Sequence, residues 1–298
     1  MLLNNINDLK HSSEQAVIIN VNTKLVTTLA LMSALKYAGM PVLLIDCEST
    51  DGSVGHFTEL MNKHGFDLLS APLKKHGDSL DWLFENISSE KVLLIDSDLE
   101  ILNSNILDMM RSFIDNEYVY GCGFIHNPHK LTDDVGSGRY VERMWIPLVM
   151  LKVSHIRNAI REGYSFADKI RYSNLAYRIF NSLTYRISNL SALRTHSSFL
   201  FKWKSSNLLK WFMQHLHGNK PYYAYSDTGA EIYQYLKHER ELFFVGFPAE
   251  LHGKFANHYH GVTRLMLGED EAHGTKLTSI QSQVQQRLYD IYGLNLIE

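Results

Sequence analysis

Apolar runs of strand length alternate with helical periodicity through the first 125 residues. Four runs predict strands, at residues 15–21, 42–46, 67–71 and 92–96. Between them, apolar positions recur three and four residues apart and predict helices around residues 25–38, 56–64 and 78–87. We expect Asp78 or Ser79 to cap the third helix. Because the strand runs are continuously apolar, they indicate a mostly parallel sheet with helices on both faces, an α/β fold.

Polar side chains gather where three of these strands end. The clusters are residues 20–23, 46–53 and 96–100. Open parallel sheets bind ligands in the crevice at the carboxyl ends of their strands, so this coincidence predicts a binding site at that edge. Neither a Walker-A sequence nor G-x-G-x-x-G occurs in the chain, which removes the two commonest nucleotide-binding loops.

The second half of the chain has a less regular pattern. Residues 126–140 are rich in turn formers and predict a mobile loop, and the basic stretch after residue 152 reads as mostly helical. An amphipathic C-terminal helix is predicted by five apolar positions, Leu277, Ile280, Val284, Leu288 and Ile291. Such a stripe packs either into the core or against a second copy of the chain, so a homodimer is one option.

Composition indicates a soluble cytoplasmic protein. The chain has 298 residues, of which 45% are hydrophobic and 20% charged, the values of an ordinary globular protein. Two cysteines, Cys47 and Cys122, are too few for a disulfide scaffold and fit a reducing compartment. The start lacks the features of a signal peptide, and the most apolar stretch, WIPLVMLKV, is too short to span a bilayer.

The net charge of −3 conceals a basic segment. Residues 152–210 carry eleven Lys or Arg against two acids, a local charge of +9, with aromatic residues interleaved. Basic and aromatic surface suits anionic lipid headgroups, diphosphate-bearing lipids or nucleic acid. A solvated basic helix face explains the same pattern equally well.

The run that ends in Asp96-Ser97-Asp98 is the clearest candidate for metal chemistry. In an extended segment residues i and i+2 point the same way, so Asp96 and Asp98 can face one point. Two carboxylates form the oxygen-rich environment that Mg²⁺ or Mn²⁺ prefers. The alternative is that an Asp just past a strand is only a turn residue or a helix N-cap.

A histidine cluster downstream strengthens the metal hypothesis. His252, His258 and His260 lie close together, and a histidine joining two carboxylates would favour Mn²⁺ over Mg²⁺. The alternative is a surface loop that is rich in histidine, in a chain with 15 of them. Asp227 precedes a predicted helix that carries Glu231, and it reads either as the N-cap or as a general base at the sheet crevice.

The chain resembles the family 2 glycosyltransferases of the GT-A fold in the order of its short motifs. These are INVN (19–22), IDCESTDGS (45–53), KKHG (74–77), D-x-D (96–98), GYSFAD (163–168), SDTGAEIY (226–233) and H-x-x-G-x-T (258–263). The resemblance runs through residues 16–264. This chain departs from the family pattern at Ser226, where an acid is usual, at Val21, where an aromatic residue is usual, and in its long basic insert.

The resemblance implies an inverting transfer of a sugar from a nucleotide-diphosphate donor to a hydroxyl of a glycan or lipid-linked acceptor, with Mn²⁺ or Mg²⁺ as cofactor. It implies that Asp227 is the catalytic base. The implied metal ligands are Asp96, Asp98, His258 and His260. The implied substrate-binding residues are Asn20, Asn22, Asp46, Glu48, Ser49, Asp51, Lys75, Asp96 and Glu231.

Two kinds of rival remain. One is a related enzyme, a retaining glycosyltransferase or a sugar nucleotidyltransferase; the other is a non-catalytic module that binds nucleotide sugars. For the organisation we expect a catalytic domain over residues 1–272, with a donor half (1–125) and an acceptor half (126–272), followed by a helical tail (273–298). We expect peripheral association with the inner face of an anionic membrane to be an option and nucleic acid not to be a partner.

Overall fold

An eight-stranded sheet forms the centre of the molecule in a computed structural model that describes residues 1–72, 74–126, 142–172, 223–259 and 274–296. In spatial order the strands are β1 (Leu2–Leu3), β4 (Asp67–Ser70), β3 (Val42–Asp46), β2 (Glu14–Asn20), β5 (Lys91–Ile95), β8 (Arg143–Lys152), β7 (Val119–His126) and β11 (Phe243–Phe247). β8 runs antiparallel to both of its neighbours, β5 and β7. The other paired strands of this sheet are parallel, which confirms the predicted mostly parallel α/β fold.

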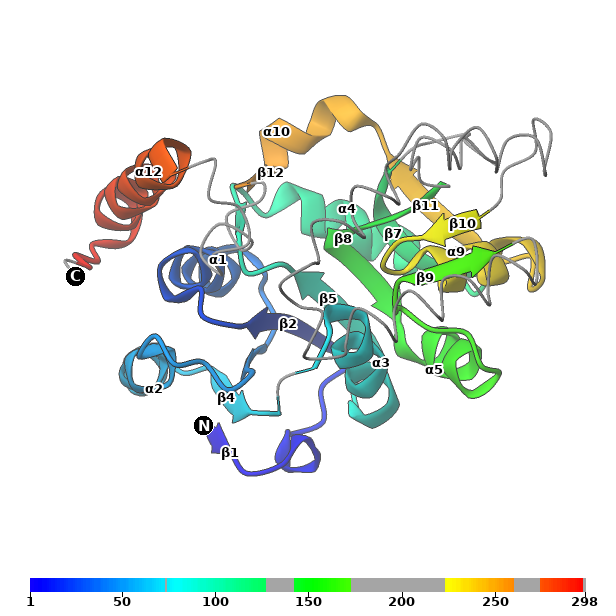
Figure 1. The fold of residues 1–298 in the computed structure, drawn as a ribbon, viewed down its shortest axis with the longest axis horizontal. Coiled ribbons are helices and arrows are strands. Elements are labelled where there is room, and N and C mark those ends of the chain that lie inside the picture. Colours follow the sequence, from blue (N-terminus) through cyan, green and yellow to red (C-terminus); the bar gives the residue numbers. More distant parts are fainter. Residues whose placement is uncertain (73, 127–141, 173–222, 260–273, 297–298) are drawn as a thin grey trace, which may run out of the picture.

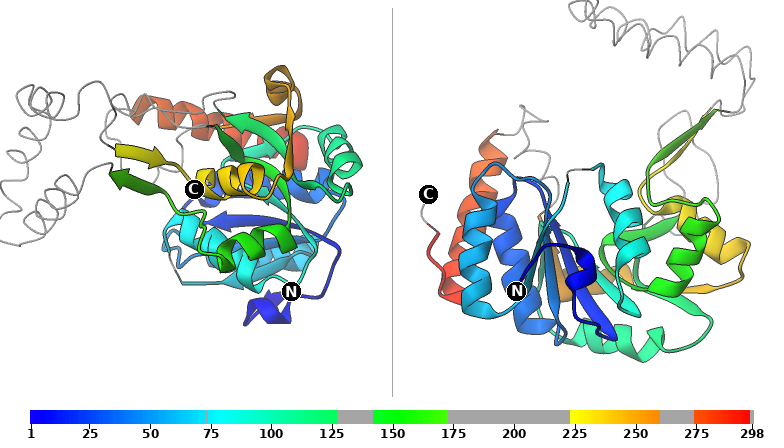
Figure 2. Two further views of the ribbon diagram at one scale, coloured as in Figure 1. Left: turned by 90° about the vertical axis from the view of Figure 1, so that its right-hand side faces the viewer. Right: turned by 90° about the horizontal axis from the view of Figure 1, so that it is seen from below.

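Helices cover both faces of the sheet (Figures 1 and 2). The helices α3 (His76–Asn86), α5 (Val153–Arg161) and α9 (Ala230–His238) pack on one face. The opposite face carries α1 (Lys24–Tyr37), α2 (Ser53–His64) and α4 (Asn105–Ile114). The shorter elements are η1 (Ile6–Asp8), β6 (Leu99–Ile101), β9 (Lys169–Tyr172), β10 (Tyr223–Ser226), η4 (Ala249–Leu251), α10 (His252–Phe255) and β12 (Ala256–His258).

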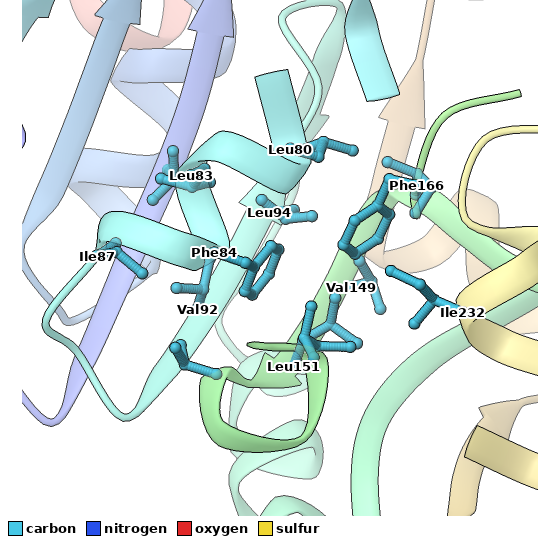
Figure 3. Close-up of a cluster of buried hydrophobic side chains, with 14 of the residues drawn as sticks. Leu80, Leu83, Phe84, Ile87, Val92, Leu94, Val149, Leu151, Phe166 and Ile232 are labelled. Atoms are coloured by element: carbon cyan, nitrogen blue, oxygen red, sulfur yellow. The ribbon is translucent and has the colours of Figure 1, made fainter. Parts of the chain in front are cut away.

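The continuously apolar strands are buried on both faces, as their sequences predicted. Val92 and Leu94 of β5 belong to the cluster under α3, where Phe84 is fully buried (Figure 3). Leu93 and Ile95, the alternate residues of the same strand, belong to the cluster under α1 and α4. Side chains alternate across a strand, so a strand covered on both sides must be apolar at every position.

One sequence prediction needs correction. Helix α3 begins at His76 with Lys75 in the N-cap position, so neither Asp78 nor Ser79 is the cap. The earlier start is possible because Gly77 lets the first turn lie against the backbone of residues 166–167. The most apolar stretch of the sequence, WIPLVMLKV, forms most of β8.

The C-terminal helix α12 (Gly274–Tyr292) packs against α1. Ile280, Val284 and Leu288 form a buried cluster with Leu25 and Leu29 of α1. The predicted apolar stripe is therefore core, at least at these three positions. A homodimer stays a prediction.

Several predicted features lie wholly or partly outside the described residues. These are residues 127–140 of the turn-rich loop, residues 173–210 of the basic stretch, and His260. The described part of the basic stretch contains helix α5, but also β9, a strand where a mostly helical segment was predicted; it pairs antiparallel with β10. The division into a catalytic domain and a tail stays a prediction.

Candidate metal centre and active site

The carboxyl ends of the central parallel strands meet at one edge of the sheet. β2 ends at Asn20, β3 ends at Asp46, and β5 ends just before Asp96. β2 pairs with both β3 and β5, which places the three strand ends side by side. The predicted gathering of polar residues at one edge of the sheet is therefore present.

A tight turn follows β5 and orients the two aspartates. The backbone N–H of Asp96 donates to the carbonyl of Pro147 in β8, over 3.0 Å. The N–H of Leu99 donates back to the carbonyl of Asp96, over 3.1 Å, which closes the turn. The chain then enters β6, so Asp98 stands between two strands that are both anchored.

A second strand brings a histidine to this turn from far along the sequence. β12 pairs antiparallel with β6, with His258 opposite Leu99. The N–H of Tyr259 also donates to the carbonyl of Asp98, over 2.9 Å. As a result Nε2 of His258 lies 3.1 Å from Oδ1 of Asp98.

Asp96, Asp98 and His258 form a group that can hold a metal ion. One ligand atom from each residue lies within 4.8 Å of the other two. Two carboxylates and an imidazole suit Mn²⁺ and related divalent ions. The pKa of Asp96 is raised, chiefly because burial disfavours its charged form. His76 and His258 oppose this rise, and the Asp98 carboxylate adds to it. A divalent cation fits this group, because it would compensate the negative charge of two carboxylates that lie close together.

Aromatic rings support the histidine. The ring of Trp145, in β8, stands perpendicular to that of His258 with centroids 5.3 Å apart. The ring of His252 packs against Trp145 instead, at 4.4 Å, and against Phe124 at 5.2 Å. Of the described histidines in the predicted cluster, His258 reaches the aspartates, and His252 belongs to this aromatic packing.

The loop after β3 is tied to the end of β2 by its own side chains. Nδ2 of Asn20 donates to Oδ1 of Asp46 over 2.6 Å, and the N–H of Ser49 donates to Oδ2 of Asp46 over 3.1 Å. The N–H of Asn22 donates to Oγ of Ser49 over 2.9 Å. Asn20 and Asp46 are almost fully buried, so within this loop they hold its shape.

Asp51 fixes the start of α1 and the start of α2. Its Oδ2 accepts from the N–H of Lys24 over 3.0 Å, and its Oδ1 accepts from the N–H of Ser53 over 3.1 Å. Glu48, by contrast, is exposed and has a left-handed backbone with φ of 53°. The structure therefore brings the predicted donor-site residues of this loop together, with Glu48 facing solvent and Asp51 holding two helix starts.

A small hollow lies between this loop and the start of α3. Its lining residues are Ile19, Ile45, Cys47, Ala71, Pro72, Lys74, Ser79 and Trp82. Nζ of Lys74 lies 5.6 Å from the ring centroid of Trp82. Lys75 is exposed at the N-cap position of α3. The predicted basic loop thus stands beside the carboxyl edge of the sheet.

Asp227 lies in the turn between β10 and α9. The N-cap of α9 is Gly229, with φ of 78°, so the hypothesis that Asp227 is only an N-cap is wrong. Its carboxylate forms a close ion pair with the guanidinium of Arg143 and accepts from the N–H of Thr228 over 2.9 Å. Glu231 accepts from the N–H of Ser165 over 3.2 Å.

Strand β8 connects Asp227 to the metal group. Arg143, Trp145 and Pro147 are alternate residues of this strand, and they contact Asp227, His258 and Asp96 respectively. At about 3.4 Å per residue, Arg143 and Pro147 are roughly 14 Å apart along the strand. Sequence reasoning missed Arg143 and Trp145; the one available signal was the apolar run that begins at Trp145.

The fold and the site define an α/β protein with a candidate divalent-metal centre at the carboxyl edge of a mostly parallel sheet. No known family profile matches the sequence, and no curated protein matches it. Among the described residues, no helix is long and apolar enough to cross a bilayer.

Comparison with solved structures finds partial similarity. The mannosyltransferase PcManGT from Pyrobaculum calidifontis, solved with GDP-Man and Mn²⁺, has a TM-score of 0.39 and 15% identity over 51% of this chain and 46% of its own. S. aureus TarS (residues 1–349) has a TM-score of 0.38 and 17% identity over 50% of this chain and 49% of its own. A CMP:2-keto-3-deoxy-manno-octonic acid synthetase complexed with CTP has a TM-score of 0.37 and 10% identity over 50% of this chain and 78% of its own. This chain spans about half the length of the first two.

Proposed function

We propose that this protein is a divalent-metal-dependent glycosyltransferase of the GT-A type. It would move a sugar, with inversion, from a nucleotide-diphosphate donor to a hydroxyl of a glycan or lipid-linked acceptor. The observation that carries the proposal is the group of Asp96, Asp98 and His258 at the carboxyl edge of a parallel sheet, where such sheets bind ligands. The proposal does not rest on the similarity to solved structures, which is low.

The donor would lie across the strand ends. Asp46, Glu48 and Ser49 would border base and ribose together with Asn20, Asn22 and Asp51. Trp82 and Lys74 line the small hollow beside this loop. Lys75, exposed at the start of α3, would reach a phosphate. The first turn of a helix also favours negative charge, because its free N–H groups point outward.

Asp96, Asp98 and His258 would hold the metal ion, with His260 as a further ligand. When bound, such an ion neutralises the charge that builds up on a nucleoside diphosphate leaving group. The role of the protein residues is to place that charge. Asp98 is largely buried, with 6% of its surface exposed, and it contacts His258 directly, so its position is the best defined of the three.

Asp227 would take the proton from the acceptor hydroxyl. The ion pair with Arg143 fixes the orientation of the Asp227 carboxylate. The guanidinium occupies one oxygen of this carboxylate, so proton transfer to that oxygen requires Arg143 to move or the acceptor to share the contact. Glu231 would border the acceptor.

The test is product analysis with a panel of nucleotide sugars and simple glycoside acceptors in the presence of Mn²⁺. An inverted anomeric configuration, read by proton NMR, supports the proposal. Retained configuration would indicate a retaining enzyme, and pyrophosphate release from a sugar phosphate and a nucleoside triphosphate would indicate a nucleotidyltransferase. Binding without any transfer or donor hydrolysis would indicate a non-catalytic module. Homodimer formation and membrane association remain predictions.

A further inference from the structure

A buried carboxylate lies two residues beyond the candidate metal ligand Asp98. Glu100, in β6, has 1% of its side chain exposed. Nε of Arg287 donates to its Oε2 over 2.6 Å, and Nη2 of Arg287 donates to its Oε1 over 2.7 Å. Arg287 belongs to α12, so a bidentate ion pair joins the C-terminal helix to the strand that follows the two aspartates.

A tyrosine next to the other candidate ligand reaches the same carboxylate. Tyr259 directly follows His258, and its hydroxyl lies 3.4 Å from Oε2 of Glu100. Its N–H also donates to the carbonyl of Asp98 over 2.9 Å. Glu100 therefore links Arg287 to Tyr259, the residue that follows His258 and donates to the carbonyl of Asp98.

Apolar packing places α12 over this contact. Val284 and Leu288, on either side of Arg287 in the sequence, are fully buried in the cluster that also contains Tyr259. Figure 1 shows α12 beside α1, on the side of the molecule toward β12. The helix cannot shift along α1 without carrying the guanidinium away from Glu100.

We infer that Arg287 is a positioning residue for the metal centre, and that α12 is a required part of the site. The inference rests on the proposed metal-dependent function. β6 and β12 pair over only three residues, and this short ladder sets the approach of His258 to Asp98. A buried carboxylate that loses its guanidinium must draw in water or turn toward another hydrogen-bond donor. Either change moves β6, and with it the geometry of the ligand atoms.

The experiment measures Mn²⁺ affinity of the full chain by isothermal titration calorimetry and by electron paramagnetic resonance. Arg287→Gln is expected to weaken Mn²⁺ binding about tenfold, the lower end of the effect of residues that orient metal ligands. Arg287→Lys keeps the charge and should recover part of the affinity. Equal Mn²⁺ affinity of wild type and Arg287→Gln would overturn the inference.

The chain offers a matched control for loss of an arginine. Nε of Arg111 donates to Glu14 over 2.9 Å at the opposite end of β2, and its side chain is 30% exposed against 36% for Arg287. Arg111→Gln should lower thermal stability and leave Mn²⁺ affinity unchanged. A loss of affinity in both variants to the same extent would mean a general effect of stability and would also overturn the inference.

A double variant covers the case in which Arg287→Gln does not fold. Glu100→Gln combined with Arg287→Gln removes both charges, which restores folding where an unpaired carboxylate was the cause of failure. This variant should still bind Mn²⁺ more weakly than wild type, and wild-type affinity would contradict the inference. Failure of wild type itself to bind Mn²⁺ would instead refute the proposed function, so the two failures are distinguishable.

Discussion

Substitution of Gly77 by alanine tests how α3 is placed beside the candidate site. Gly77 is the second residue of α3, where helix propensity alone favours alanine over glycine by up to about 1 kcal/mol. A Cβ atom at this position would lie 2.4 Å from Cα of Ala167, 2.6 Å from its N and 2.7 Å from the carbonyl carbon of Phe166. Helix propensity therefore predicts that Gly77→Ala stabilises the protein, whereas packing predicts that it destabilises the protein.

Packing should dominate in this case. Non-bonded carbon atoms rest at about 3.5–4.0 Å, so α3 and the segment 166–167 must separate by roughly 1 Å to accept the methyl group. The neighbouring atoms are backbone, and Asp81 holds them in place by accepting from the N–H of Phe166 over 2.8 Å. Overpacking costs about 1–3 kcal/mol, and a clash with backbone atoms belongs near the upper end of that range, which leaves a net loss of about 2 kcal/mol after the helix-propensity gain.

The assay is urea unfolding of Gly77→Ala beside a control at Gly55, in the first turn of α2. A Cβ atom at Gly55 meets no other atom within 4 Å, so Gly55→Ala should stabilise the protein by about 0.4–1 kcal/mol. A Gly77→Ala variant as stable as wild type, or more stable, would refute the close packing of α3 on residues 166–167. Lys75, proposed to reach a phosphate, is the N-cap residue of the same helix. A displaced α3 should therefore also weaken nucleoside diphosphate binding.

Two further predictions concern single side chains. Asp227→Asn should leave nucleotide-sugar affinity nearly unchanged and cut transfer about 100-fold or more, as loss of a general base does. Wild-type turnover of Asp227→Asn in steady-state kinetics would contradict this. Burial raises the pKa of Cys47 to about 11, helped by Asp46 and Glu48, so only about one thiol in 10,000 is ionised at pH 7. Iodoacetamide should therefore label Cys47 slowly at pH 7 and faster as the pH approaches 11, and rapid labelling of the folded protein at pH 7 would contradict its burial.

The parallel sheet and its polar edge could be predicted because their signals are local. Continuous apolar runs follow directly from burial on both faces. Asp96 and Asp98 do lie together as predicted, but the tight turn after β5 brings them together rather than an extended segment. The C-terminal helix was predicted for the same reason, since its apolar stripe has helical spacing.

The completion of the site was less accessible to sequence reasoning. His258 reaches Asp98 through the pairing of β12 with β6, 160 residues apart, and no local pattern encodes that register. Arg143 and Arg287 were missed because a charged residue beside an apolar run usually faces solvent, and only tertiary structure supplies their carboxylate partners. Asp227 was correctly placed before a helix, but its ion pair with Arg143 depends on β8, which the sequence pattern did not identify as a strand.

The most direct test of the metal-dependent function is the thermal stability of the protein with nucleoside diphosphates. UDP, GDP, ADP and CDP are each added with Mn²⁺ or with EDTA, to wild type and to Asp98→Asn. A ligand that binds only the folded state at 100 times its dissociation constant adds about 2.7 kcal/mol of stability. We expect at least one nucleotide to raise the melting temperature of wild type with Mn²⁺, and this rise to disappear in EDTA and in Asp98→Asn. An equal rise under all three conditions, or no rise with any nucleotide, would contradict a metal-dependent nucleotide-sugar site at Asp96, Asp98 and His258.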